Sequence, residues 1–320
     1  MKYIEKYGMK LSKIGLGTGR FGTRIEEEIS FEMLDRFVEN GGNVIDTARN
    51  YYEWVENGRG ISEKTIGKWM AKRCRRSDVY ISTKGGVRNE NINFFVNLSY
   101  NNLLDEIEQS REALQTDNID IYLLHRDEQE RHVEEIVENL QKIQEKIKAK
   151  AIGVCNWKAE RVMKANKYAK LHGLIPIQII QTWWSIAAYT PDMWNDPTTT
   201  YMDQNMYEYL KKHNMLGMAY TSQAKGFFQK AISEGVDNLD PFLKKRIATP
   251  ENLERLERIR EYSNKNGISP TAVVNGYITD NEVDGIALVS CSKLEQLYDI
   301  LENCDVIINE DWLKEMAVEK

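Results

Sequence analysis

Eight short apolar runs, separated by amphipathic stretches, constrain the fold of this chain more than any other feature. The runs occupy residues 13–17, 43–48, 78–84, 119–125, 151–156, 177–184, 216–221 and 285–290. Each is short and mostly apolar, as expected of a parallel strand covered on both faces. The ends of the first seven runs lie roughly 28 to 41 residues apart, which suits one strand and one helix per unit.

Amphipathic helical patterns fill the intervals between these runs. In residues 98–115, for example, Leu103, Ile107 and Leu114 share one side of the helix. The predicted helices span residues 27–40, 62–73, 98–115, 133–148, 159–172, 202–213, 253–265, 270–280 and 294–304. Eight such units, without a linker rich in Pro, Gly or Ser, predict one α/β domain over residues 1–320, a (β/α)8 or TIM barrel. A short β-hairpin around Tyr7 and Gly8 is expected before the first barrel strand.

An open dinucleotide-binding sheet is the competing fold. Residues 17–22 read Gly-Thr-Gly-Arg-Phe-Gly, a literal G-x-G-x-x-G, and Asp46 ends the next apolar run. The helix after such a motif offers bare N–H groups to a pyrophosphate. Here residues 26–28 are three glutamates, which would repel that anion. Eight units also exceed the six strands of a dinucleotide domain, so the barrel is preferred.

Composition excludes several classes of function. The chain has 43 Lys and Arg against 49 Asp and Glu, a net charge of −6, and no sustained basic stripe, which argues against nucleic acid or an anionic membrane as partner. No run approaches the roughly 18 apolar residues of a membrane helix, and the N-terminus lacks the apolar segment of a signal peptide. No C-x-x-C pair occurs among Cys74, Cys155, Cys291 and Cys304. We therefore expect no metal site, and reduced thiols in a cytoplasmic protein.

Three consecutive runs end in chemically active side chains. Asp46, Lys84 and His125 end the second, third and fourth predicted strands, and Tyr51 lies on the loop after Asp46. The C-terminal ends of barrel strands meet at one rim, where the active site of such barrels lies. Each residue alone has an ordinary explanation, as a turn acid, a solvated strand end, a packed rim tyrosine or a core histidine. Their occurrence on consecutive strands favours a common site.

These four side chains suit the protonation of a carbonyl oxygen. A tyrosine with an ordinary pKa near 10 exchanges protons slowly at neutral pH. We expect the Lys84 ammonium to lower the pKa of Tyr51, and Asp46 to keep the lysine charged and oriented. His125 would hydrogen-bond to the substrate oxygen. No side chain supplies a hydride, so a nicotinamide cofactor is implied.

The sequences around these residues resemble the aldo-keto reductase family nearly from end to end. The matching stretches are GLGT at 15–18, IDTARNYY at 45–52, SEKTIG at 62–67, ISTKGG at 81–86, DIYLLHRD at 120–127, AIGVCNW at 151–157, AYTSQAKGFF at 219–228 and SCSKLEQL at 290–297. The resemblance implies an NAD(P)H-dependent oxidoreductase that interconverts an aldehyde or ketone, such as a sugar or aryl carbonyl, and its alcohol. It implies that Tyr51 is the general acid and base, that Lys84 and Asp46 tune it, and that His125 orients the carbonyl.

Cofactor contacts follow from the same resemblance. Cys155 and Asn156 stand where the family has a Ser-Asn pair on the nicotinamide carboxamide, and Cys155 brings a thiol, a weak donor. Tyr220 occupies the position of the aromatic residue that stacks on the nicotinamide. Residues 221–250 correspond to a segment that covers the cofactor, and Lys225 of this segment would pair with a phosphate. The implied cofactor-binding residues are Thr18, Gly19, Asp46, Cys155, Asn156, Gln181, Tyr220, Thr221, Ser222, Gln223, Lys225, Gly226, Ser290, Ser292, Lys293 and Gln296. Serines and Lys293 can hold an adenosine 2′-phosphate, so NADP(H) is favoured and NAD(H) is the alternative.

The substrate is expected among aromatic residues at the mouth of the barrel. The predicted substrate-binding residues are Tyr52, Trp54, His125, Trp157 and Trp184, with Trp183 and Trp194 nearby. An aromatic rim suits sugars or aryl aldehydes, although the same residues serve as ordinary packing.

Two other functions stay open. One is a nicotinamide-binding regulatory subunit with negligible turnover, like the channel-associated members of this family. The other is a barrel lyase or isomerase that uses the Lys84 amine to form a Schiff base. The expected partner is a small carbonyl or alcohol, and the oligomeric state is left open.

Overall fold

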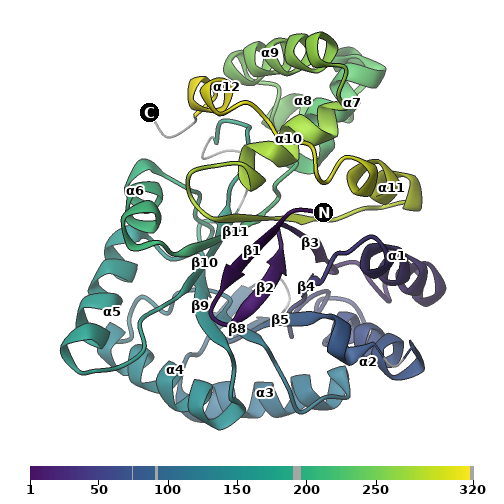
Figure 1. The fold of residues 1–320 in the computed structure, drawn as a ribbon. Coiled ribbons are helices and arrows are strands. Elements are labelled where there is room, and N and C mark those ends of the chain that lie inside the picture. Colours follow the sequence, from purple (N-terminus) through teal and green to yellow (C-terminus); the bar gives the residue numbers. More distant parts are fainter. Residues whose placement is uncertain (74, 91–92, 190–195, 318–320) are drawn as a thin grey trace.

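Eight parallel strands close into a barrel that follows the order of the chain (Figure 1). The computed structural model describes residues 1–73, 75–90, 93–189 and 196–317. The barrel strands are β3 (Ile14–Gly17), β4 (Val44–Asp46), β5 (Tyr80–Gly85), β8 (Ile121–Leu124), β9 (Ala151–Cys155), β10 (Ile179–Trp183), β11 (Leu216–Tyr220) and β12 (Gly285–Val289). Pairing of β12 with β3 closes the ring, with Leu288 opposite Gly15. The (β/α)8 barrel predicted from the spacing of the apolar runs is confirmed.

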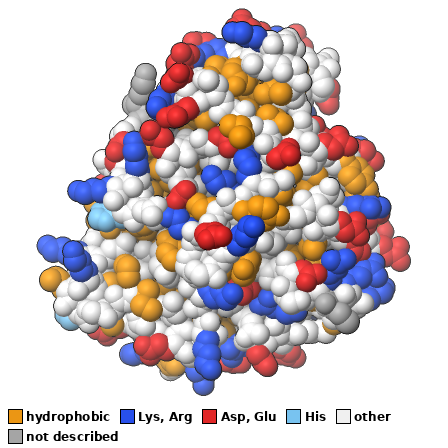
Figure 2. All heavy atoms as spheres, viewed as in Figure 1, with side chains coloured by type: hydrophobic (Ala, Val, Ile, Leu, Met, Phe, Trp, Pro, Cys, Tyr) orange, Lys and Arg blue, Asp and Glu red, His pale blue; other side chains and the backbone are white. Residues whose placement is uncertain are grey.

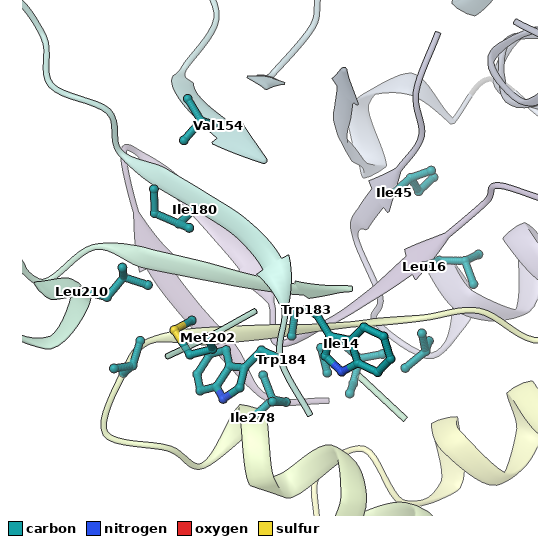
Figure 3. Packing of buried hydrophobic residues seen from close by; sticks show 14 of the residues in the cluster. Ile14, Leu16, Ile45, Val154, Ile180, Trp183, Trp184, Met202, Leu210 and Ile278 are labelled. Atoms are coloured by element: carbon teal, nitrogen blue, oxygen red, sulfur yellow. The ribbon is translucent and has the colours of Figure 1, made fainter. Parts of the chain in front are cut away.

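Each predicted helix forms, with ends that differ by at most three residues. They are α1 (Glu27–Glu39), α2 (Ile61–Arg73), α3 (Tyr100–Leu114), α4 (Val133–Ile147), α5 (Ala159–Leu171), α6 (Gln204–His213), α9 (Pro250–Asn266), α10 (Pro270–Thr279) and α11 (Leu294–Glu302). Helix α4 shows why the patterns succeed, because Ile136, Leu140 and Ile143 are buried at helical spacing. Most of these helices surround the barrel in Figure 1, and their apolar faces form the layer between helices and sheet. Figure 3 shows part of this layer, where Met202 and Ile278 lie beside Trp184.

The predicted N-terminal hairpin consists of β1 (Tyr3–Lys6) and β2 (Met9–Ser12). Tyr7 and Gly8 turn the chain with φ of 51° and 70°, the pattern of a tight hairpin turn. Met9 and Leu11 are buried in one cluster with interior residues such as Val44 and Leu216, which start their strands. The hairpin therefore closes the N-terminal end of the barrel, and it crosses in front of the barrel in Figure 1. On this face acidic and basic side chains are interspersed (Figure 2).

Several short elements were not predicted. Helices α7 (Phe227–Glu234) and α8 (Pro241–Arg246) occupy the long interval between β11 and β12, and α12 (Glu310–Glu315) follows α11. Strands β6 (Val87–Glu90) and β7 (Asn93–Val96) form a hairpin after β5. The segment 221–250, expected as a covering loop, is therefore largely helical. Buried Phe227 and Phe228 anchor α7, and the Asp240 carboxylate caps α8.

Candidate functional site

Four side chains from neighbouring strands meet at the C-terminal end of the barrel. Asp46 ends β4, Lys84 lies near the end of β5, and His125 follows β8. These three strands are consecutive in the sheet. Tyr51 reaches the same place from the loop after β4, and its ring meets the His125 ring edge to face with centroids 5.8 Å apart.

Lys84 is the centre of the hydrogen-bond network in this site. Its buried Nζ donates to Asp46 Oδ2 at 2.6 Å, to the Thr47 carbonyl at 2.6 Å and to the Tyr51 hydroxyl at 3.1 Å. The other carboxylate oxygen, Asp46 Oδ1, accepts from Ser82 Oγ at 2.9 Å and from Gln181 Nε2 at 3.0 Å. An ammonium with three acceptors and a carboxylate with both oxygens bonded form a rigid pair.

Burial decides the protonation of the phenol. Burial raises the pKa of Tyr51, and the Lys84 charge offsets only part of that effect. Lys84 lowers the pKa of Tyr51, as expected, but desolvation of the phenolate outweighs this effect, so the net pKa lies above its ordinary value. Burial alone would lower the pKa of Lys84, but Asp46 and Tyr51 raise it above its ordinary value. The site thus holds a neutral phenol beside a charged ammonium.

His125 is a neutral imidazole in this environment. Burial lowers its pKa well below the ordinary value, and the charges of Arg126 and Lys84 act in the same direction. Its Nδ1 is buried and has no hydrogen-bond partner among the residues described. A neutral histidine can hydrogen-bond to a substrate oxygen without competing with Lys84 for the negative charge of Asp46.

The residues implied for the nicotinamide carboxamide lie together but bond to one another. Cys155 Sγ donates to Gln181 Oε1 at 3.7 Å, and burial raises the pKa of this thiol to about 12. Asn156 Oδ1 accepts from the Tyr220 hydroxyl at 2.7 Å, and Asn156 Nδ2 contacts the His125 carbonyl at 3.4 Å. Gln181 also donates to Asp46 Oδ1 at 3.0 Å and so holds this carboxylate in place. No local sequence pattern signals this role.

A groove with a volume of about 760 Å³ lies where the chain leaves β11 and β12, and none of the four catalytic candidates is among its lining residues. The groove is lined by Thr221, Ser222, Gln223, Lys225, Gly226, Ser290, Ser292 and Gln296 from the predicted cofactor set, together with residues such as Leu288 and Cys291. Lys293 is not among its lining residues. Thr18 is buried, and its hydroxyl donates to the Asp46 carbonyl at 2.9 Å, so it joins the ends of β3 and β4. Its contact with the cofactor stays a prediction. Gly19 lies against the Tyr51 ring, since a Cβ there would be 3.6 Å from it.

Two arginines missed in the sequence add positive charge to this groove. Arg20 and Arg24 line it from the loop between β3 and α1, facing Lys225 and Lys230. Arg20 Nη1 donates to Ser292 Oγ at 2.5 Å, across 272 positions of sequence. Burial lowers the pKa of Lys225 to about 8, and the Arg20 charge acts in the same direction. The position of Arg20 and Arg24 after the first strand could have indicated this role, because the loop that follows each barrel strand lies at the rim that carries the active site.

The predicted tryptophan contacts need correction. Trp184 is only 2 % exposed and lies on the outer side of the sheet, where a Cβ added at Gly217 or Gly285 would be 3.1 or 2.9 Å from its ring (Figure 3). It packs edge to face with Tyr207 of α6. Its neighbours are strand glycines and a covering helix, so its position does not support the predicted substrate contact.

Trp157 is likewise buried, at 1 % exposure, with the Arg161 guanidinium 5.3 Å from its ring, and its position does not support the predicted substrate contact. Trp183 is buried too, against Tyr189. Tyr52 and Trp54 do lie on the loop after β4, stacked with centroids 5.0 Å apart, and Trp54 is 56 % exposed. The predicted Trp194 lies outside the described residues.

The described ranges hold neither a candidate metal site nor a helix that could span a membrane. No group of three or more His, Cys, Asp or Glu side chains among them could hold a metal ion. None of the helices described there combines the length and apolar character that crossing a bilayer requires.

Comparison with known proteins identifies the family. A sequence model of the aldo/keto reductase family matches residues 13–317. Norsolorinic acid reductase of Aspergillus flavus is 26 % identical over 324 residues, covering 97 % of this chain and 78 % of the relative. Aldo-keto reductase YhdN of Bacillus subtilis is 26 % identical over 98 % of this chain and 91 % of its own. An aryl-alcohol dehydrogenase of Pestalotiopsis microspora is 36 % identical over 48 % of this chain and 40 % of its own.

Proposed function

Because the chain belongs to the aldo/keto reductase family, we propose that it is an NAD(P)H-dependent oxidoreductase that interconverts an aldehyde or ketone and its alcohol. The observation that carries this proposal is the position of Lys84 Nζ, 2.6 Å from Asp46 Oδ2 and 3.1 Å from the Tyr51 hydroxyl. A phenol next to a fixed positive charge can give up a proton and leave a stabilised phenolate, which is what carbonyl reduction requires.

Tyr51 is the proton donor in this mechanism. Its raised pKa keeps the hydroxyl protonated at neutral pH, ready for transfer to the carbonyl oxygen. The Lys84 ammonium then stabilises the phenolate, while Asp46 prevents the lysine from moving. The neutral His125 holds the carbonyl oxygen beside Tyr51. A bound nicotinamide supplies the hydride.

Lys84 is better suited to this role than to forming a Schiff base. A Schiff-base lysine must present a neutral amine to the carbonyl carbon. Here the pKa of Lys84 is raised by Asp46 and Tyr51, and its three hydrogen bonds occupy the ammonium. The ammonium therefore acts as a fixed charge.

The groove suits a phosphorylated dinucleotide. Its lining includes the four cations Arg20, Arg24, Lys225 and Lys230 against the two acids Asp240 and Asp299. The depressed pKa of Lys225 reflects burial close to a like charge, which a bound phosphate would relieve. We therefore favour NADP(H), with the adenosine phosphate near Arg20 and Ser292 and with residues 221–250 covering the cofactor.

An aryl carbonyl is the favoured substrate class. The stacked pair Tyr52 and Trp54 offers exposed aromatic surface on the loop that also carries Tyr51. One relative is named as an aryl-alcohol dehydrogenase. A flat aromatic aldehyde would stack on these rings with its carbonyl directed towards Tyr51.

The test compares Tyr51→Phe with Tyr52→Phe as the matched control. With NADPH and 4-nitrobenzaldehyde, Tyr51→Phe should lower kcat by about 10²- to 10⁴-fold, the usual contribution of a general acid, while NADPH affinity is unchanged. Tyr52→Phe keeps its ring and should retain turnover close to that of the wild type. A Tyr51→Phe enzyme with the wild-type rate contradicts the assigned role. A wild-type protein that binds NADPH but reduces none of a panel of aldehydes, ketones and sugars is a regulatory subunit instead.

A further inference from the structure

Two buried carboxylates hold the two ends of β5, the strand that carries Lys84. At the end near Lys84, Glu106 of α3 accepts from the Gly86 amide through Oε2 at 2.6 Å. At the opposite end, Asp120 accepts from the Ile81 amide at 2.9 Å. Each carboxylate also pairs with an arginine, Glu106 with Arg59 at 3.0 Å and Asp120 with Arg76 at 2.8 Å. The two interactions are alike in chemistry and differ in which end of the strand they hold.

Arg59 connects Glu106 to the loop that carries Tyr51. This loop runs from the end of β4 at Asp46 to the start of α2 at Ile61. Arg59 lies near its end, and its guanidinium bonds to Glu53 of the same loop at 2.7 Å as well as to Glu106. One carboxylate therefore contacts both the segment of Tyr51 and the chain two residues beyond Lys84.

The surroundings leave Glu106 little freedom to move. Its side chain is 1 % exposed, and a Cβ added at Gly85 would be 2.9 Å from Glu106 Oε2 and 2.3 Å from the Tyr122 hydroxyl. The Tyr122 hydroxyl is buried and has no hydrogen-bond partner in the described part of the chain. Loss of the carboxylate charge would leave Arg59 with Glu53 of its own loop but without Glu106, and would weaken the link between the Tyr51 loop and the chain after β5.

We infer that Glu106 is a positioning residue that sets Tyr51 relative to Lys84 by holding the Tyr51 loop and the end of β5 with one carboxylate. The inference builds on the proposed function, because its catalytic consequence requires that Tyr51 donates the proton. Glu106 acts through Arg59 and Gly86, to which its carboxylate is hydrogen-bonded.

Comparison of Glu106→Gln with Asp120→Asn tests this inference. Each change keeps the shape and an acceptor for the strand amide, and each removes the charge that faces an arginine. A misplaced reacting group costs up to about 100-fold in rate. We expect kcat with 4-nitrobenzaldehyde to fall by roughly 10- to 100-fold in Glu106→Gln, with the NADPH dissociation constant unchanged, and to stay near wild type in Asp120→Asn.

A double variant shows whether Arg59 and Glu106 act as one unit. If they do, the loss of kcat in Arg59→Met/Glu106→Gln should be no larger than in the worse single variant. Losses that multiply would overturn the coupling through Arg59.

Hydrogen exchange provides a readout that does not depend on turnover. Glu106→Gln should speed exchange of amides in residues 47–60 and at Gly86, whereas Asp120→Asn should speed exchange at Ile81 and leave 47–60 unchanged. Wild-type kcat and exchange in Glu106→Gln overturn the inference, as does an equal loss of kcat in both variants. A wild-type enzyme without turnover counts against the proposed function, and the exchange pattern then decides alone whether Glu106 holds the loop.

Discussion

The Nζ atom of Lys84 lies 3.1 Å from the hydroxyl of Tyr51, although the two residues are 33 positions apart in the chain. The phenol comes from the loop after β4 and the ammonium from β5, the next strand of the barrel. Burial raises the pKa of Tyr51 and the ammonium opposes that rise. Lys84 is therefore placed to stabilise the phenolate during the reaction, while the resting enzyme keeps a proton on Tyr51.

The raised pKa of Tyr51 predicts opposite pH dependences for the two directions of reaction. Reduction needs the protonated phenol, which persists below the pKa, so kcat/KM for an aldehyde should be level from about pH 6 to pH 9 and fall only beyond the ordinary tyrosine value near 10. Oxidation of the alcohol needs the phenolate and should rise across the same range. In Lys84→Met the rise should move to higher pH, because the charge that lowers the pKa is absent. A reduction rate that already falls near neutral pH contradicts this assignment.

Arg20 should determine the preference for NADPH. Removing one charged hydrogen-bond partner costs about 1.5–3 kcal/mol, so Arg20→Gln should raise the KM for NADPH roughly 10- to 100-fold. The KM for NADH, which lacks the 2′-phosphate, should change little. Lys293→Gln is the matched control, because Lys293 carries the same charge but does not line the groove. Steady-state kinetics with both cofactors check this, and a larger effect of Lys293→Gln would restore the assignment made from sequence.

Trp184 and Trp54 should affect different properties of the protein. Trp184→Ala removes a buried ring between sheet and helices, and we expect a loss of about 3–5 kcal/mol in the free energy of unfolding measured in urea. Trp54→Ala removes an exposed ring, and stability should change by no more than about 0.5 kcal/mol. Its KM for 4-nitrobenzaldehyde should instead rise about threefold to tenfold, since an aromatic contact contributes roughly 0.5–1.5 kcal/mol. Unchanged KM in Trp54→Ala would show that the substrate does not stack there.

Much of the fold could be predicted because its signals are local. The eight apolar runs and nine amphipathic patterns correspond to strands and helices of the structure, since apolar spacing reports directly which face of an element is buried. The missed elements are short. Helices α8 and α12 span six residues each, too few to show a period, and they are stabilised by caps and packing such as that of Trp312 on Tyr262. The same brevity hides the β6–β7 hairpin.

The candidate site could be predicted only in part. The positions of Asp46, Lys84 and His125 at the ends of consecutive strands follow from barrel geometry, so their meeting could be expected. The bond from Gln181 to Asp46 crosses 135 positions of sequence and has no local signature. The side of the sheet on which Trp184 lies could not be predicted, because a residue after a strand end can turn to either side. The glycines of β11 and β12 against which its ring packs lie far along the chain.

The sequence by itself determined the barrel, the order of its strands and the four side chains that share one rim, because the apolar periodicity of strands and helices depends on residues close together in the chain. Only the tertiary structure decided the protonation of Tyr51, the proximity of Arg20 to Lys225, and the contact of Glu106 with both the Tyr51 loop and Gly86, the residue after β5. Desolvation and Coulomb interactions depend on which distant segments pack around a group and at what distance, and these distances are set only once the chain has folded.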